Sequence, residues 1–195
     1  MGSRKIILTL DSGERDVVLG LDCSSKTVGW GLLACQPVEL MAHGHFNPLP
    51  SKHHFIARLD DVFKRVTALC DEFLPSIVAV EDIIQHMKRG MGSSAQTITI
   101  LAAFNRVAAL AAWRNGVRDL FFYPVSTIRK TIREGIGREA KIEKEDIPGI
   151  VRANLCPAFS DVISKRGSVS DFTMDEADGI AVGWAHVISS GKSGR

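Results

Sequence analysis

The sequence lacks several features that would place it in a broad class at once. Its four cysteines are Cys23, Cys35, Cys70 and Cys156. None of them forms a C-x-x-C pair and no secretory signal is present, which predicts reduced thiols in a cytoplasmic protein. No run of about 18 apolar residues is found, so we expect no membrane span. The net charge is only +2, too small to indicate nucleic-acid binding from composition alone.

The chain has 195 residues, of which 45% are hydrophobic and 24% are charged. This balance is ordinary for a globular protein and gives enough apolar surface for one core. No internal repeat or long linker divides the chain. We therefore expect residues 1–195 to form a single domain, with an additional strand or a tag at 1–16 and a flexible tail at 189–195.

The hydrophobic pattern predicts an α/β protein with a five-stranded mixed sheet. Three antiparallel strands are expected first, followed by strands joined through helices, and helices flank the sheet. The expected strands are 6–10 (a short extra one), 17–22, 28–33, 39–45, 77–80 and 120–123. The expected helices are 55–74, 94–115, 126–132, 148–155 and 174–188, with Ser126 as a cap, Gly116 as a stop and loops at 90–94 and 164–171.

Four acidic residues occupy unusual places in this pattern. Asp22 ends the apolar run 17–21, Glu81 ends the run 77–80, and Asp175 and Asp178 begin the last apolar helix. A carboxylate that closes a buried strand is costly unless something pairs with it. Magnesium prefers oxygen ligands, and two such ions roughly 4 Å apart support phosphodiester hydrolysis. The four acids together therefore predict one shared cation site.

Each acid also has a structural interpretation when it is considered alone. Asp22 could begin a turn with Ser24 and Ser25. Glu81 could face water at a strand end, and Asp175 could be an ordinary acid in a first helical turn. The occurrence of all these features in one strand order favours the shared site.

Other polar residues near these acids are predicted to be structural. Thr173 and Glu176 fit a capping box, and Asp82 should point to the face of the strand opposite Glu81. His186 shares a helix face with Asp178, where a contact to a metal-bound water is possible, but a half-buried structural histidine is the favoured interpretation.

Four motifs in this order resemble those of RuvC-type Holliday junction resolvases. They are Val18 to Asp22 with Gly29-Trp30-Gly31, then Ala79-Val80-Glu81, then Ile128 to Ile132 with Gly135-Ile136-Gly137 and Lys141, and finally Asp175 to Ala181. The resemblance extends from about Val17 to His186. It implies an RNase H-like fold, a homodimer and Mg²⁺-dependent symmetric nicking of four-way DNA junctions, with Mn²⁺ able to substitute.

The same resemblance implies roles for individual residues. The metal ligands would be Asp22, Glu81, Asp175 and Asp178, with Lys141 as a further catalytic residue. Lys130 and Lys141 match basic residues near the scissile phosphate. Phosphate contacts of this kind position DNA and stabilise developing charge. The full set of expected DNA-binding residues is Lys88, Arg89, Arg129, Lys130, Arg133, Arg138 and Lys141.

The chain departs from the bacterial pattern at several positions. Cys23-Ser24 follows the first acid where bacterial members have Pro-Gly, and Ile84 replaces an aromatic residue used for junction opening or base stacking. The turn at 24–26 and the Gly29-Trp30 pair resemble phage-encoded members. The sequence thus fits a bacterial or a phage-infected cell, and it does not identify a branch-migration partner.

The helix expected at 94–115 is apolar on more than one face, so it is either wholly buried or shared with a second copy. Two other nuclease and binding functions remain open. They are an RNase H-like nuclease that acts on RNA–DNA hybrids or flaps, and a non-catalytic DNA-binding module. An actin- or hexokinase-like ATPase is disfavoured, because a second glycine-rich phosphate loop and a larger chain are missing.

Overall fold

A computed structural model describes residues 16–82, 95–155 and 173–191. Its centre is a five-stranded sheet with the strand order β3-β2-β1-β4-β5. The strands are β1 (Val17–Cys23), β2 (Val28–Cys35), β3 (Val38–Phe46), β4 (Ile77–Asp82) and β5 (Asp119–Pro124). β1, β2 and β3 pair antiparallel, whereas β4 runs parallel to both β1 and β5. The predicted α/β mixed sheet is therefore confirmed.

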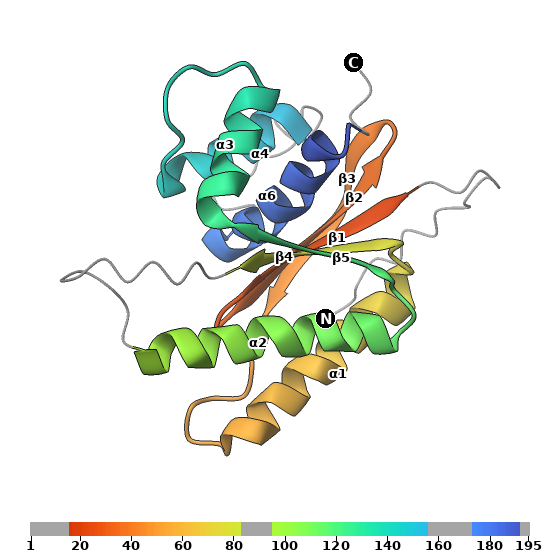
Figure 1. Cartoon of the computed structure of the whole chain (residues 1–195), viewed down its shortest axis with the longest axis vertical. Coiled ribbons are helices and arrows are strands. Elements are labelled where there is room, and N and C mark those ends of the chain that lie inside the picture. The colour runs from red at the N-terminus through yellow and green to blue at the C-terminus, as the bar shows by residue number, and fades with distance from the viewer. Residues whose placement is uncertain (1–15, 83–94, 156–172, 192–195) are drawn as a thin grey trace, which may run out of the picture.

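Helices cover both faces of the sheet (Figure 1). The helices are α1 (Phe55–Phe73), α2 (Ala95–Arg114), α3 (Val125–Gly135), α4 (Ile147–Leu155) and α6 (Met174–Ser189), with a short 3-10 helix η1 (Lys144–Asp146) before α4. α1 and α2 lie on one face, and α3, α4 and α6 lie on the other. Each face has its own apolar core, and α6 packs directly on β1 and β2.

The element boundaries differ from the sequence expectations in small ways. Strands β1 to β5 each extend one or two residues beyond the predicted ends, because pairing with neighbours continues past the apolar run. Ser126 is not the cap of α3, which begins at Val125 after Pro124 without a side-chain cap. The turn η1 was not expected. Gly116 does follow α2 as predicted, with a φ of +97° that suits glycine.

Several expectations fall outside the described residues. They are the strand at 6–10, the loops at 90–94 and 164–171, and the roles of Ile84, Lys88 and Arg89. Cys156 also lies there, whereas Cys23, Cys35 and Cys70 are buried thiols that form no disulfide.

α2 is the one helix within the described ranges that is long and apolar enough to cross a membrane by length and composition. The helix includes polar residues such as Asn105 and Arg106, so it is not an unbroken apolar run, and the expectation of no membrane span stays a prediction. α2 packs against α1, β1 and β4, with buried residues that include Phe104, Ala108 and Ala112. A core helix of a globular domain has the same composition.

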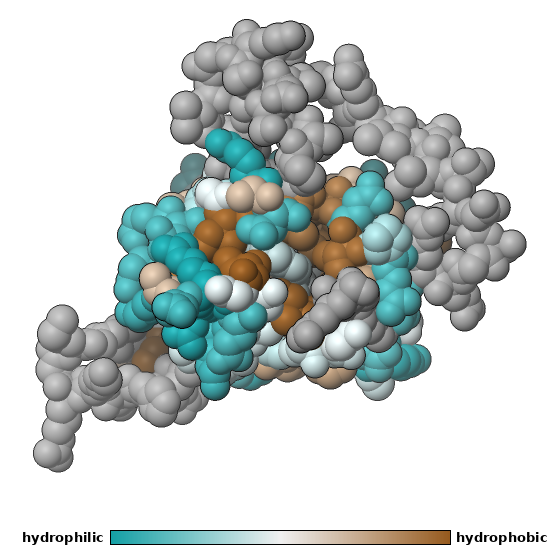
Figure 2. All heavy atoms as spheres, turned by 90° about the horizontal axis from the view of Figure 1, so that it is seen from above, coloured by the Kyte–Doolittle hydropathy of each residue, from teal (hydrophilic) through white to brown (hydrophobic). Residues whose placement is uncertain are grey.

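Viewed from the end of the molecule that carries α3 and α4, hydrophilic side chains surround a central group of apolar ones (Figure 2). On the α6 side of the sheet, partly buried apolar residues such as Leu40, Ile136 and Ile188 pack against the core.

Candidate metal centre

The alternation of side chains along β1 and β4 places Asp22 and Glu81 on the same face of the sheet. Leu21 and Val80 are register partners in the parallel pair β1–β4, and both belong to the core on the α1 side. The next residue of each strand therefore points to the opposite face, toward α6. Asp22 and Glu81 thus lie side by side where two parallel strands end.

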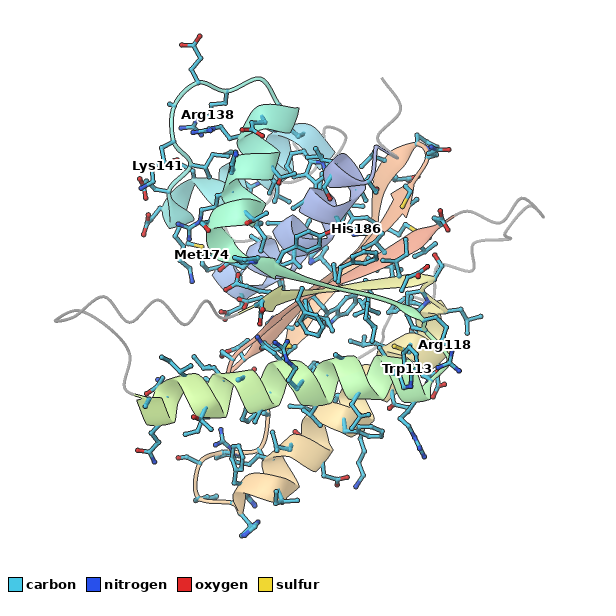
Figure 3. The ribbon with its side chains drawn as sticks, viewed as in Figure 1. Trp113, Arg118, Arg138, Lys141, Met174 and His186 are labelled. Atoms are coloured by element: carbon cyan, nitrogen blue, oxygen red, sulfur yellow. The ribbon has the colours of Figure 1, made fainter. Side chains whose placement is uncertain are left out.

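Glycines allow α6 to bring its two acids to the same place. A Cβ atom on Gly29 would lie 1.8 Å from the Asp175 carbonyl oxygen, and one on Gly20 would lie 2.3 Å from the Gly179 carbonyl oxygen. Gly29 is in turn the register partner of Asp22. The backbone of α6 therefore touches the backbone of β1 and β2, and its start lies beside the end of β4 (Figure 1). Met174, labelled in Figure 3, marks this start.

The four acids influence one another electrostatically. Burial raises the pKa of the Asp22 carboxyl to about 7, and the nearby Asp178 carboxylate adds to the rise. Burial likewise raises the pKa of Glu81 to about 8, and repulsion from Asp22 and Asp178 contributes. The pKa of Asp178 is also raised, first by burial and in smaller part by Asp175. Asp22, Glu81 and Asp178 therefore resist ionisation, because of burial first and the neighbouring carboxylates second.

Two cationic side chains oppose this rise. The Lys144 ammonium lies 3.1 Å from the Asp178 Oδ2 atom and lowers the pKa of Asp22, Glu81 and Asp178. Arg129 lowers the pKa of Glu81 and Asp178. Positive charge thus gathers at the edge of the acid cluster, from η1 and from α3.

The donor chemistry of the cluster fits a divalent cation. The four side chains offer only carboxylate oxygens, the ligands that magnesium prefers. Within residues 16–82, 95–155 and 173–191, no three acidic, histidine or cysteine side chains are arranged as a ready-made metal-ligand group. Lys144 instead pairs with Asp178. A divalent cation bound among these carboxylates would oppose their repulsion and favour their ionised forms.

Neighbouring residues hold the strand ends in place. The buried Asn105 side chain on α2 donates a hydrogen bond to the Glu81 carbonyl oxygen at 2.6 Å. After β1, the Ser24 hydroxyl oxygen accepts hydrogen bonds from the Lys26 and Thr27 amides, and Arg58 donates to the Ser25 carbonyl oxygen. The predicted turn after Asp22 therefore exists in addition to the acid cluster.

The family model for Crossover junction endodeoxyribonuclease RuvC matches residues 18–158 of this chain. The chain belongs to the RuvC family. Among curated relatives, RuvC of Rubrobacter xylanophilus is 29% identical over 183 residues, which cover 92% of this chain and 89% of the relative. RuvC of Caulobacter vibrioides is 29% identical over 171 residues, covering 87% and 88% respectively.

Solved structures of the family share this fold. Thermus thermophilus RuvC in complex with a Holliday junction substrate matches with a TM-score of 0.68 and 17% identity, covering 90% of this chain and 94% of that chain. The yeast mitochondrial Holliday junction resolvase Ydc2 matches with a TM-score of 0.56 and 16% identity, covering 88% and 78%. These matches confirm the RNase H-like fold of the RuvC family. The phage-like features of the turn at 24–26 remain a prediction.

The lysine that lies beside the acids is Lys144 rather than Lys141. Lys141 is largely exposed and its ammonium lies 2.8 Å from the Glu143 carboxylate. Figure 3 shows Lys141 and Arg138 on the loop between α3 and α4. The three-residue turn η1 instead directs Lys144 to Asp178. Lys144 is thus the lysine beside the acids, and the catalytic and DNA-binding roles expected of Lys141 stay predictions.

Most of the other basic residues of this segment have acidic neighbours. Lys130 and Arg133 lie 3.9 Å and 3.7 Å from Glu134, and Arg138 lies 3.3 Å from Asp146. Such exposed pairs are weak and exchange readily for a phosphate. The DNA contacts expected of Arg129, Lys130, Arg133 and Arg138 thus remain predictions.

The structural assignments near the acids are confirmed. Thr173 and Glu176 form both hydrogen bonds of the capping box, and Asp82 pairs with Arg106 on the α2 side of the sheet at 3.0 Å. His186 is buried rather than half-buried, and its Nδ1 atom lies 2.9 Å from the Tyr123 hydroxyl.

Sequence reasoning missed Lys144, Asn105 and two histidines of β3, because their positions depend on turns and on contacts between distant segments. Lys144 follows Lys141 by three residues in the same basic segment. The sequence alone gives no reason to prefer Lys144 over Lys141 as the lysine beside the acids.

Proposed function

We propose that this protein is a divalent-metal-dependent endonuclease that resolves four-way DNA junctions by paired nicking. One observation carries the proposal: buried acids from β1, β4 and α6 converge on one place, where burial first and mutual repulsion second raise the pKa of Asp22 to about 7 and that of Glu81 to about 8. Membership in the Crossover junction endodeoxyribonuclease RuvC family supports the reaction. The Thermus relative solved with a Holliday junction supports the substrate.

The proposed ligands are Asp22, Glu81, Asp175 and Asp178, with Mg²⁺ as the cation and two ions in each site. When bound, such ions would activate a water and stabilise the leaving oxygen of a phosphodiester. Asp22 lies on the central strand β1, beside Glu81 on one side and α6 on the other. Its carboxylate is therefore the best placed to be shared.

Lys144 and Arg129 would supply positive charge at the phosphate. The Lys144 ammonium pairs with Asp178. If cations occupied the acids, this ammonium would be available to contact a DNA phosphate. The basic residues Lys130, Arg133, Arg138 and Lys141, together with Lys88 and Arg89, would hold the flanking backbone.

A homodimer would place two such sites on one junction. On α2, Leu110 and Trp113 are 50% and 46% exposed and lie three residues apart, on one face of the helix. Exposed apolar side chains on a core helix support an interface with a second copy.

Nicking assays with a four-way junction, an RNA–DNA hybrid and a flap as competing substrates test the function. We expect Mg²⁺- or Mn²⁺-dependent nicking of the junction to dominate, with symmetric cuts. Preferential cleavage of the hybrid or the flap would instead assign the site to another RNase H-like activity. Junction binding without any cleavage would make the protein a DNA-binding module.

A further inference from the structure

Two histidines on the edge strand β3 face the start of α6. His43 and His45 are two residues apart, so both side chains point to the same side of the sheet. β3 lies at the end of the strand order, and α6 packs against it. Neither histidine belongs to the acid cluster or to the basic segment.

Both imidazoles converge on one carboxylate. The His45 Nδ1 atom lies 2.6 Å from the Glu176 Oε1 atom, and the His43 Nδ1 atom lies 3.4 Å from Oε2. Because a carboxylate only accepts hydrogen bonds, the Nδ1 atom of His45 is the donor in this pair. Glu176 is only 9% exposed, whereas both histidine side chains are partly exposed.

Capping alone does not account for this arrangement. The Glu176 Oε2 atom accepts the Thr173 amide at 3.3 Å, and the Thr173 hydroxyl accepts the Glu176 amide at 3.2 Å. The capping box therefore needs no histidine. A buried carboxylate is costly, however, and the imidazoles reduce this cost by pairing with it.

The contacts link the edge strand to the proposed ligands. Glu176 lies between Asp175 and Asp178 in the first turn of α6. His45 is the register partner of Gly29, the residue whose backbone touches the Asp175 carbonyl group. The first turn of α6 is thus held by β2 through backbone contact and by β3 through Glu176.

We infer that His43 and His45 are positioning residues, which hold Glu176 and thereby set the placement of Asp175 and Asp178 toward Asp22 and Glu81. The inference rests on the proposed function, because the acids it positions are the proposed metal ligands. The histidines do not touch the metal or the DNA in this account.

A matched pair of double variants tests this role. His43→Phe with His45→Phe keeps ring-sized side chains without a donor, whereas His43→Asn with His45→Asn keeps an N–H near the Nδ1 position. Three quantities are measured: hydrogen exchange of the amides at 175–178 in the metal-free protein, the Mg²⁺ concentration for half-maximal junction nicking, and junction affinity without metal.

For the phenylalanine pair we expect about tenfold faster exchange and an about tenfold higher Mg²⁺ requirement, as for other residues that orient metal ligands. The asparagine pair should restore the wild-type exchange rate and the wild-type Mg²⁺ requirement. The junction affinity of both double variants should stay within about twofold of the wild type. If the phenylalanine double variant does not fold, the single changes His45→Phe and His45→Asn make the same comparison.

Unchanged exchange and an unchanged Mg²⁺ requirement in the phenylalanine variants would overturn the inference. Equal defects in the phenylalanine and asparagine variants would also overturn it, because they would indicate a general packing role. Failure of the proposed function is separable: wild-type protein would then show no metal-dependent nicking, while hydrogen exchange would still report whether the histidines hold α6.

Discussion

Asp22 and Glu81 are buried acids whose pKa values of about 7 and about 8 leave them partly protonated at neutral pH. Burial is the first cause, and repulsion within the cluster is the second. An arrangement of this kind is unfavourable for the fold by itself and becomes favourable when a cation binds. Strongly shifted pKa values in neighbouring buried acids are typical of functional sites.

Lys144 is expected to matter more for nicking than Lys141. Lys144→Met removes the charge that lowers the pKa of Asp22, Glu81 and Asp178, so these pKa values should rise. The acidic limb of the pH–rate profile should therefore move to higher pH, and single-turnover nicking at pH 7 should fall at least about tenfold.

Lys141→Met is the matched control, because it removes an exposed lysine that pairs with Glu143. We expect it to weaken junction binding modestly and to leave the pH–rate profile in place. If the pH–rate profile of nicking shifts in Lys141→Met and not in Lys144→Met, Lys141 would be the lysine that acts in catalysis.

The sequence identifies some of these residues and not others. Asp22 and Glu81 are visible because each directly ends an apolar strand, and strand polarity puts both at one edge of the sheet. Lys144 is not visible, since only the turn η1 decides which lysine reaches Asp178. His43 and His45 act on a residue more than 130 positions away, which no local pattern encodes.

The contact of α6 with β1 and β2 is the packing feature on which the site depends most. Gly20, Gly29 and Gly31 on the strands face Gly179, Gly183 and Ile180 on the helix, and any added Cβ atom on the strand glycines would lie within 3.0 Å of the helix. This close approach is why a helix can place carboxylates next to strand-end carboxylates.

Gly29→Ala is expected to destabilise the fold and to displace Asp175, because the new methyl group would meet backbone that has no room to move. We expect a loss of about 3 kcal/mol in the free energy of unfolding, from overpacking. Chemical denaturation measures the loss, and nicking should fall with it.

Gly149→Ala is the control on α4, where an added Cβ atom meets nothing within 4 Å. In a helix interior this change should stabilise by about 0.5–1 kcal/mol. Equal stability of the Gly29→Ala variant and the wild type would show that α6 does not depend on this contact.

Hydrophobic periodicity predicts the strands and most helices well, since burial on both faces leaves continuous apolar runs in β1 and β4. Periodicity does not predict elements whose position depends on local polar contacts. α3 begins at Val125 without help from Ser126, and η1 has no buried residue to signal it. The α2 pattern leaves open how much of the helix is buried, and the structure shows Leu110 and Trp113 exposed.

The stability of the protein should depend on pH through the acid cluster. In the unfolded chain Asp22 and Glu81 titrate at about 4, whereas in the folded metal-free protein they titrate at about 7 and about 8. Between these values the folded state binds more protons, so their contribution to stability falls as pH rises from about 4 and levels off above about 8.

The double variant Asp22→Asn with Glu81→Gln should lack this slope and be more stable than the wild type at pH 8 without metal. Adding Mg²⁺ should raise the stability of the wild type and have little effect on the variant. Denaturant unfolding between pH 5 and pH 9 makes the comparison. Identical pH dependence of the two proteins would contradict the burial of these acids.

The association state tests the role proposed for α2. Leu110→Glu with Trp113→Glu should produce a monomer in sedimentation equilibrium, because charges would enter the proposed apolar interface. Ile56→Glu, which changes another exposed apolar residue on α1, should leave the association state unchanged. A dimer that survives the α2 changes would place the interface elsewhere.

The most direct test is single-turnover nicking of a four-way junction by the wild type, Asp22→Asn and Glu81→Gln over a range of Mg²⁺ concentrations. Each variant is expected to bind the junction with an affinity near that of the wild type and to lose at least about a hundredfold in nicking rate. Full nicking by either variant would contradict a metal centre built from these strand-end acids.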